Sequence, residues 1–100
     1  MRVISRKLLR EFWSRHPDAE PWLRHWYKLA SQAAWNSLQD IRRDYPHADG
    51  VAVSPGEKLT VFNVGGNKYR LIVRIRYDYQ LVNVRAILTH QAYSEGKWKD

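Results

Sequence analysis

The 100-residue sequence contains no cysteine, which excludes disulfides and any cysteine-based metal or redox site. No apolar run approaches the length of a transmembrane helix, and the opening MRVISRKLLREF is too charged for a secretory signal peptide. We therefore expect a cytoplasmic protein with no membrane contact. No two of the histidines, His16, His25, His47 and His90, are spaced i, i+3 or i, i+4. We predict no metal site and no cofactor.

Acidic residues are scarce beside basic ones, with 10 Asp and Glu against 17 Lys and Arg. The formal net charge is +7, which in so small a chain favours nucleic acid or an acidic protein as partner. An apolar content of 44% is typical of a globular protein with a real core. The length predicts a single domain spanning residues 1–100.

The N-terminal part has helical hydrophobic periodicity. Arg2–Ile4 is a candidate edge strand, and Ser5 is the predicted N-cap of a helix over Arg6–Arg15. Asp18 is the predicted cap of a second helix, whose apolar residues recur from Trp22 to Ala34. Because the connection between them is short, the two helices should form an antiparallel hairpin.

A third helix and a loop are predicted before the strands. Ser37 and Asp40 resemble a capping box, which predicts a short helix ending before Pro46. The turn-rich segment His47–Glu57 is predicted to be a mobile loop. The helical part also holds four of the five tryptophans, Trp13, Trp22, Trp26 and Trp35. At helical spacing they are more often core than base-stacking residues, although not all four can be fully buried.

The stretch Lys58–Tyr93 predicts antiparallel strands joined by tight turns. Gly65-Gly66 favours a two-residue hairpin loop, because glycine accepts positive φ without steric cost. That loop pairs Val64 with Asn67. A second turn near residues 78–80 leads to the last strand and pairs Arg74 with Arg85.

Alternation along these strands defines two faces. The predicted core face carries Thr60, Phe62, Val64, Tyr69, Leu71, Val73, Ile75, Tyr77, Val82, Val84, Ala86 and Leu88. The other, which we call the arginine face, carries Leu59, Val61, Asn63, Lys68, Arg70, Ile72, Arg74, Arg76, Asn83, Arg85, Ile87 and Thr89. With Arg74 directly opposite Arg85 and no acid on this face within either strand, a polyanion would relieve the repulsion. The alternative is a solvated face whose arginine stems cover Ile72 and Ile87.

The strings VFNVGGNKYRL and, further along, ILTHQAY resemble HigB-type toxins of the RelE superfamily, which are ribosome-dependent mRNA endonucleases of bacterial type II toxin–antitoxin systems. The order of strand, two helices and three antiparallel strands is also similar to that family. The resemblance implies an α+β, RelE-like fold. In it, an N-terminal strand and a helical hairpin pack on a C-terminal three- or four-stranded antiparallel sheet.

The resemblance also implies a reaction, the cleavage of mRNA by attack of a ribose 2′-OH on the adjacent phosphate without a metal. Arg70 would contact the phosphate, Lys68 would add charge, and His90 would exchange a proton near neutral pH. The further RNA-binding candidates are Lys58, Asn63, Asn67, Arg74, Arg85 and Tyr93. Of these, Arg74 is a candidate only because it lies on the arginine face, and not because it matches the family motif. The implied partners are mRNA on the ribosome and a cognate antitoxin, with no small-molecule substrate.

Strict alternation places two of these candidates, Lys58 and His90, on the core face. The chain would have to bend after Thr89 for His90 to reach the arginine face; otherwise His90 caps a helix that starts at Gln91. Two other functions remain open, a ParE-like gyrase inhibitor and a non-catalytic nucleic-acid-binding module. The antitoxin would cover either the arginine face or the helical hairpin, and we favour the hairpin because its tryptophans are suitable interface anchors.

Overall fold

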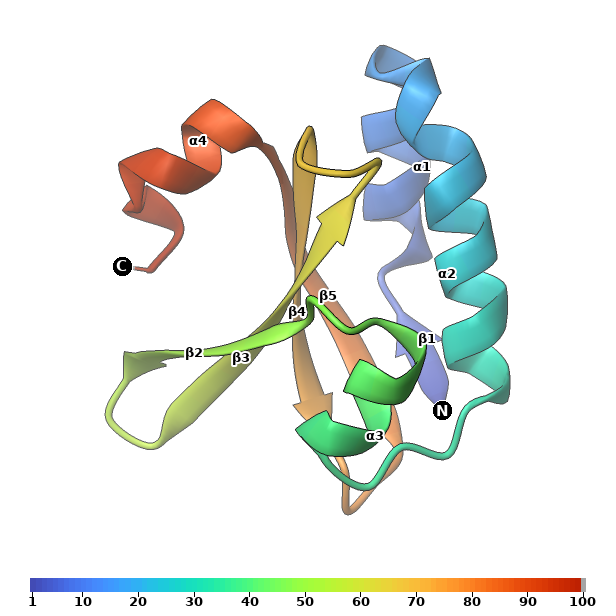
Figure 1. Ribbon diagram of the computed structural model, residues 1–100, viewed down its shortest axis with the longest axis vertical. Helices are drawn as coiled ribbons and strands as arrows, with labels where there is room; N and C mark the ends of the chain where they lie inside the picture. The colour runs from blue at the N-terminus through green and yellow to red at the C-terminus, as the bar shows by residue number, and fades with distance from the viewer. Residues whose placement is uncertain (100) are drawn as a thin grey trace.

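A computed structural model describes residues 1–99 as a twisted sheet with helices on both faces (Figure 1). Its helices are α1 (Arg6–Arg15), α2 (Glu20–Gln32), α3 (Leu38–Asp44) and α4 (His90–Glu95), with short 3₁₀ turns η1 (Pro17–Ala19) and η2 (Lys97–Lys99). Its strands are β1 (Arg2–Ile4), β2 (Asp49–Ser54), β3 (Glu57–Val64), β4 (Tyr69–Arg76) and β5 (Leu81–Thr89). The predicted α+β class is confirmed. None of the helices in this part of the chain is long and apolar enough to cross a membrane.

The sheet has five strands in the order β1-β5-β4-β3-β2. β1 runs parallel to β5, with Arg2 opposite Leu81, and every other neighbouring pair is antiparallel. The four strands β2 to β5 form the predicted C-terminal antiparallel sheet, and β1 adds a parallel fifth strand at its edge, so the whole sheet is mixed. The N-terminal amino group anchors β1 by donating to the carbonyls of Ala30 and Ala33 at the end of α2.

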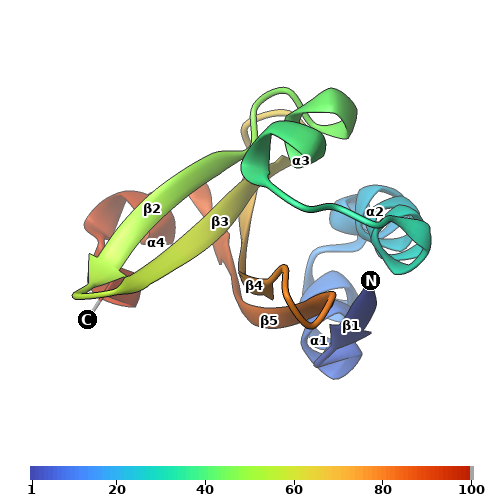
Figure 2. The ribbon, with the colours of Figure 1, turned by 90° about the horizontal axis from the view of Figure 1, so that it is seen from below.

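The segment His47–Glu57 is not the loop that its glycines and proline predict. Asp49–Ser54 forms β2 and pairs with β3, and only the turn at Pro55-Gly56 separates the two strands. Gly56 has a φ of 80°, which glycine accepts at little cost. The prediction was wrong because the turn residues outweighed the β-branched Val51 and Val53, which build the strand. The β2–β3 hairpin extends away from α1 and α2 (Figure 2).

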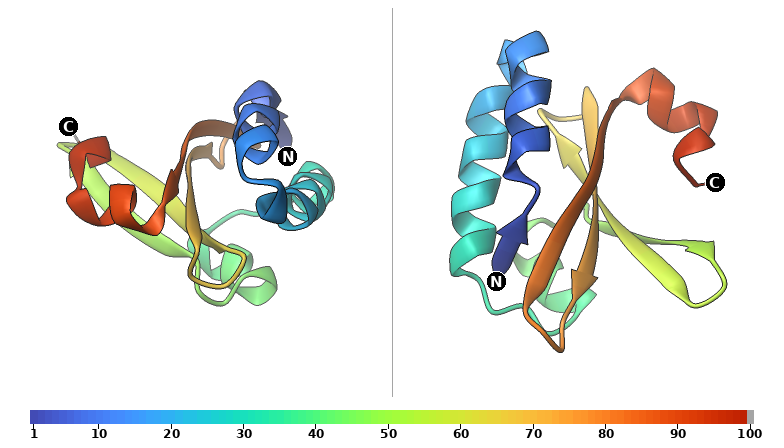
Figure 3. Two further views of the ribbon diagram at one scale, coloured as in Figure 1. Left: turned by 90° about the horizontal axis from the view of Figure 1, so that it is seen from above. Right: turned by 180° about the vertical axis from the view of Figure 1, so that it is seen from behind.

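Helices α1 and α2 form the predicted hairpin and cover one face of the sheet (Figure 3). Leu9, Leu23 and Trp26 are fully buried there together with the sheet residues. The latter are Phe62, Val64, Leu71, Val73, Val82 and Val84. Trp26 and Trp35 are buried, whereas Trp13 and Trp22 are only partly covered, so the four tryptophans are not all in the core.

Two of the three predicted N-cap side chains make no capping hydrogen bond, although α1 spans Arg6–Arg15 with Ser5 at its N-cap position, as predicted. Ser5 has a φ of 72° and makes no side-chain cap; its hydroxyl lies 3.5 Å from the Asn83 side-chain oxygen. Asp18 lies in η1 and does not cap α2. Ser37 does cap α3, since its hydroxyl accepts from the backbone N–H of Asp40 at 3.3 Å. Contacts elsewhere in the fold therefore override the local capping preference at two of these sites.

Both hairpin loops are two residues longer than predicted. Val64 pairs with Tyr69, so the first loop comprises residues 65–68, with both glycines at positive φ. Arg76 pairs with Leu81, and Arg74 therefore opposes Asn83 rather than Arg85. Each error is an even number of residues, which leaves every side chain of β3 and β4 on its predicted face.

Arg85 forms a β-bulge that changes the faces of β5. Val73 pairs with Val84 but the next residue along, Ile72, pairs with Ala86, so Arg85 has no partner on β4. A bulge inverts the alternation beyond it. Ile87 accordingly packs against the helical core, while Ala86 packs on the opposite face with Leu88. The predicted faces of residues 86–89 were therefore wrong.

The arginine face has a small core of its own. Leu59, Val61 and Ile72 are buried on it. Partly buried residues pack around them: Val51, Val53, Ala86, Leu88, Tyr93 and Trp98. Helix α4 lies on this side of the sheet, opposite α1 and α2 (Figure 1). The second face is thus partly covered and is not a flat, solvated surface.

Candidate functional site

Arg70 lies on β4 between two strands, opposite Asn63 on β3 and Leu88 on β5. It is only 9% exposed, and its guanidinium donates to the carbonyls of Asn67 (3.2 Å) and Tyr69 (3.1 Å). The Asn67 side-chain oxygen is a third acceptor at 3.5 Å. All three acceptors are neutral, and within residues 1–99 no carboxylate forms an ion pair with Arg70. Arg70 is therefore a positioned cation that lacks a counter-ion within this part of the chain.

Tyr93 and Trp98 extend this site into an aromatic stack. The Arg70 guanidinium carbon lies 5.4 Å from the centre of the Tyr93 ring, and that ring stacks on Trp98 at 5.1 Å with 15° between the planes. The Trp98 indole N–H donates to the Tyr93 carbonyl at 2.9 Å. Sequence reasoning missed Trp98, although a single tryptophan in an otherwise polar tail was the available signal.

His90 is exposed and is the first residue of α4, one position earlier than the helix start considered from sequence. The Thr89 hydroxyl caps this helix by accepting from the backbone N–H of Ala92 at 3.2 Å. The bulge inverts the alternation of β5. Continued by two residues, that alternation puts position 90 on the same face as Leu88, which is the partner of Arg70. The bulge supplies the change of face that the predicted role of His90 required.

Lys68 does not lie on the arginine face as predicted. Its ammonium group pairs with Asp18 at 3.1 Å, beside the helices, and the Tyr69 hydroxyl donates to the same carboxylate at 2.7 Å. These two hydrogen bonds, with that of Tyr69 the stronger, hold the pKa of Asp18 below its ordinary value. Asp18 therefore links η1 to Lys68, the last residue of the β3–β4 loop, and to Tyr69, the first residue of β4.

The repulsion predicted between Arg74 and Arg85 is relieved inside the molecule. Glu57, at the start of β3, lies 3.6 Å from each of the two guanidinium groups. The prediction that a polyanion relieves this repulsion was wrong, because it counted only the acids on the strands of the two arginines, whereas Glu57 lies on β3. Both side chains stay about two-fifths exposed, at 43% and 42%.

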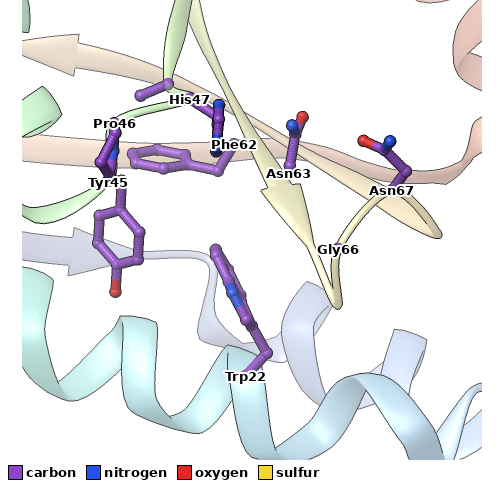
Figure 4. Close-up of a pocket in the computed structure, with 9 residues that line it drawn as sticks. Trp22, Tyr45, Pro46, His47, Phe62, Asn63, Gly66 and Asn67 are labelled. Atoms are coloured by element: carbon purple, nitrogen blue, oxygen red, sulfur yellow. The ribbon is translucent and has the colours of Figure 1, made fainter.

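The remaining candidates lie apart from one another. Asn63 and Asn67 line a cavity of about 480 Å³ together with Trp22 and Tyr45 (Figure 4). Lys58 lies near the other end of β3, opposite Ala52. The fold thus brings Arg70, Asn67, His90 and Tyr93 to one end of the sheet. Lys58, Lys68, Arg74 and Arg85 lie outside this group.

A mixed sheet and a helical hairpin define a small, basic protein of α+β fold. Arg70, which forms no ion pair within residues 1–99, lies at the same end of its sheet as the exposed His90. The family model described as "HigB_toxin, RelE-like toxic component of a toxin-antitoxin system" matches residues 19–96. The chain belongs to this family, and the resemblance noted from its motifs is confirmed.

Three curated relatives are similar over nearly the whole chain. They are the "mRNA interferase toxin HigB" of Escherichia coli K12 and the proteins named "mRNA interferase HigB" of Escherichia coli O157:H7 and Shigella flexneri. Each is 24% identical over 93 residues, which cover 93% of this chain and 88% of the relative.

Proposed function

We propose that this chain is the toxin of a type II toxin–antitoxin system and an endoribonuclease that cleaves mRNA on the ribosome, in the cytoplasm. The observation that carries this proposal is the location of two residues at the same end of the sheet. They are Arg70, which has no counter-ion among residues 1–99, and the exposed His90. The names of the relatives support the activity. We also propose that residues 1–100 act as one domain.

The proposed reaction is metal-independent and transfers the phosphate within the RNA. The ribose 2′-oxygen forms a bond to the adjacent phosphorus while the bond to the leaving 5′-oxygen breaks. The 2′-OH proton goes to a general base, and the 5′-oxygen takes a proton from an acid. Arg70 stabilises the negative charge that develops on the phosphorane oxygens, since it is already positioned and largely shielded from water. His90 is the proposed acid.

The other candidates have supporting roles in this proposal. Tyr93, held by Trp98, offers an aromatic ring on which a base beside the cleaved bond can stack. Asn67 orients Arg70 through its carbonyl and side-chain oxygens, and Lys68 fixes His90 by accepting its backbone N–H.

The outlying basic residues contact the RNA backbone away from the cleaved bond. Arg74 and Arg85 contact it further along the arginine face, and Lys58 does so near the β2–β3 turn. Asn63, opposite Arg70 on β3, is the remaining proposed RNA contact.

The test is to express the chain in bacteria and to map the 5′ ends of cellular mRNA. We expect cuts within translated codons, and we expect them to disappear from a reporter mRNA whose start codon has been removed. Cuts that persist in the untranslated reporter would show that the cleavage does not require the ribosome. DNA damage without mRNA cleavage would instead indicate a gyrase inhibitor, and neither effect would leave a binding module.

A further inference from the structure

The last three residues of β3, 62–64, have a neighbouring strand on one side only. β2 pairs with β3 as far as Asp49 opposite Val61 and no further. The preceding residues turn away, with the Ala48 N–H donating to the Tyr45 carbonyl and the Ala48 carbonyl accepting from Arg42 at 2.9 Å. Within residues 1–99, no backbone hydrogen bond reaches positions 62–64 from that side. Phe62 and Val64 are almost fully buried, so the backbone groups that this strand edge can offer to another extended chain are the N–H and C=O of half-buried Asn63.

The 480 Å³ cavity opens beside this free edge. Its walls come from α2, from the turn before β2 and from the β3–β4 hairpin, and they include Trp22, Tyr45, Phe62 and Asn67. The Trp22 and Tyr45 rings lie 5.5 Å apart, and in Figure 4 Trp22 rises from α2 toward the space between Tyr45 and the hairpin. The volume falls within the range of roughly 300–1,000 Å³ that is usual for ligand pockets.

The composition of the cavity favours a peptide over RNA. None of its nine lining residues is Lys or Arg, so a phosphate would find no ammonium or guanidinium there. Its aromatic walls suit a bulky apolar side chain instead. In strand addition, main-chain hydrogen bonds to the edge provide affinity, and alternate side chains of the added strand enter pockets beside it. A free edge next to an aromatic cavity is the arrangement that this mode of binding needs.

We infer that the antitoxin adds an extended segment along residues 62–64 and places a bulky apolar side chain in the cavity next to Trp22. This inference rests on the antitoxin partner of the proposed function and does not depend on the nuclease activity. The net charge of +7 favours a segment flanked by acidic residues, which would speed association. An antitoxin docked here would leave Arg70 on the other face. It would contact Asn67, which lines the cavity and whose oxygens hold Arg70 in place.

The experiment uses the full chain and the protein encoded beside it, co-expressed and purified as a complex. Hydrogen exchange should slow at the amide of Asn63, the half-buried residue of this edge, on complex formation. Trp22→Ala should weaken binding about 30-fold, as expected of a hot-spot side chain. The matched control is Trp13→Ala, because Trp13 is also a partly covered tryptophan of the helical hairpin but does not line the cavity. It should change the affinity less than about threefold.

Each other outcome overturns the inference in a recognisable way. Equal weakening by the two tryptophan variants would place the partner on the outside of the helical hairpin. Protection confined to Lys68–Arg76 and Arg85–His90 would place it on the arginine face. A Trp22→Ala chain that binds its partner normally but no longer cleaves mRNA would make the cavity an RNA subsite. The exchange measurement uses the wild-type complex, so it remains decisive if Trp22→Ala does not fold.

Cleavage by the free wild-type chain is measured separately. A chain that binds its partner at residues 62–64 without cleaving mRNA would refute the nuclease proposal and leave this inference standing. A chain that cleaves mRNA but does not bind the neighbouring protein would do the opposite.

Discussion

The backbone N–H of His90 donates to the carbonyl of Lys68 at 3.0 Å, which joins the first residue of α4 to the β3–β4 loop. The same loop contains Asn67, whose oxygens accept from Arg70. Asp18 in turn holds the Lys68 side chain from the helical layer. One loop therefore sets the positions of both the proposed phosphate-binding residue and the proposed acid.

Arg70→Ala should abolish growth arrest and also lower stability by about 1–3 kcal/mol, because three hydrogen bonds to a nearly buried guanidinium are lost. A position on the face away from the core would by itself suggest an exposed residue whose loss leaves the fold unchanged, but Arg70 is nearly buried. Thermal unfolding and growth curves measure the two effects. The control Arg76→Ala removes an exposed ion pair with Asp78 and should leave the stability nearly unchanged. Full toxicity of Arg70→Ala at equal expression would show that Arg70 does not bind the scissile phosphate.

His90→Gln should slow mRNA cleavage by roughly 10²–10⁴-fold, the usual contribution of one acid–base group, while ribosome binding survives. His90 is exposed, so the fold should tolerate the change. Single-turnover cleavage on programmed ribosomes separates the two steps. His25→Gln, on the exposed side of α2, serves as the control. A variant with weak binding but normal cleavage at saturation would assign His90 to docking.

Glu57→Gln should strengthen RNA binding several-fold at low salt, because Arg74 and Arg85 lose the carboxylate they share. If both arginines then contact phosphates, the slope of log K against log salt should steepen by about 0.7 for each contact on a single strand. Fluorescence anisotropy with a short RNA at several salt concentrations measures both quantities. Glu20→Gln breaks an ion pair on α2 and provides a matched control. An unchanged salt slope would show that the two arginines stay away from the RNA.

Deleting Arg85 should be tolerated nearly as well as replacing it. Arg85→Ala keeps the bulge and removes a partly exposed side chain, so it should cost less than about 1 kcal/mol. The deletion removes the unpaired residue of the bulge, so Ala86 would follow Val84 directly and could still pair with Ile72. The residues beyond it would then keep their faces, and we expect similar melting temperatures for the two variants. A much lower melting temperature of the deletion variant would show that the bend of β5 at the bulge is itself needed for stability.

Asp18→Asn should destabilise the fold at neutral pH, and the difference from the wild type should vanish in acid. The Tyr69 and Lys68 contacts lower the pKa of Asp18 in the folded state, so the ionised carboxylate stabilises the fold above its unfolded pKa. That contribution is lost as the pH falls from the unfolded pKa through the lower folded one. Urea unfolding at neutral pH and below pH 4 measures it. A stability difference that persisted in acid would mean that Asp18 acts through packing rather than charge.

The sequence by itself determined the face of every side chain in β3 and β4, because both strands keep a regular two-residue period and the errors in loop length were even. It also determined the α+β class, the helical hairpin and the family motif that contains Arg70 and His90. These features depend on residues that are neighbours in the chain, and a periodic pattern records such neighbours directly.

Only the tertiary structure decided what the site residues contact. Glu57 meets Arg85, Asp18 meets Lys68, and Trp98 stacks on Tyr93. The first two contacts join residues that lie far apart in the chain, and the stack depends on how the last turns fold back. No residue spacing in the sequence therefore predicts any of the three contacts. The bulge at Arg85 carries no glycine or proline signal, yet it turns Ile87 to the helical core and Ala86 and Leu88 to the opposite face.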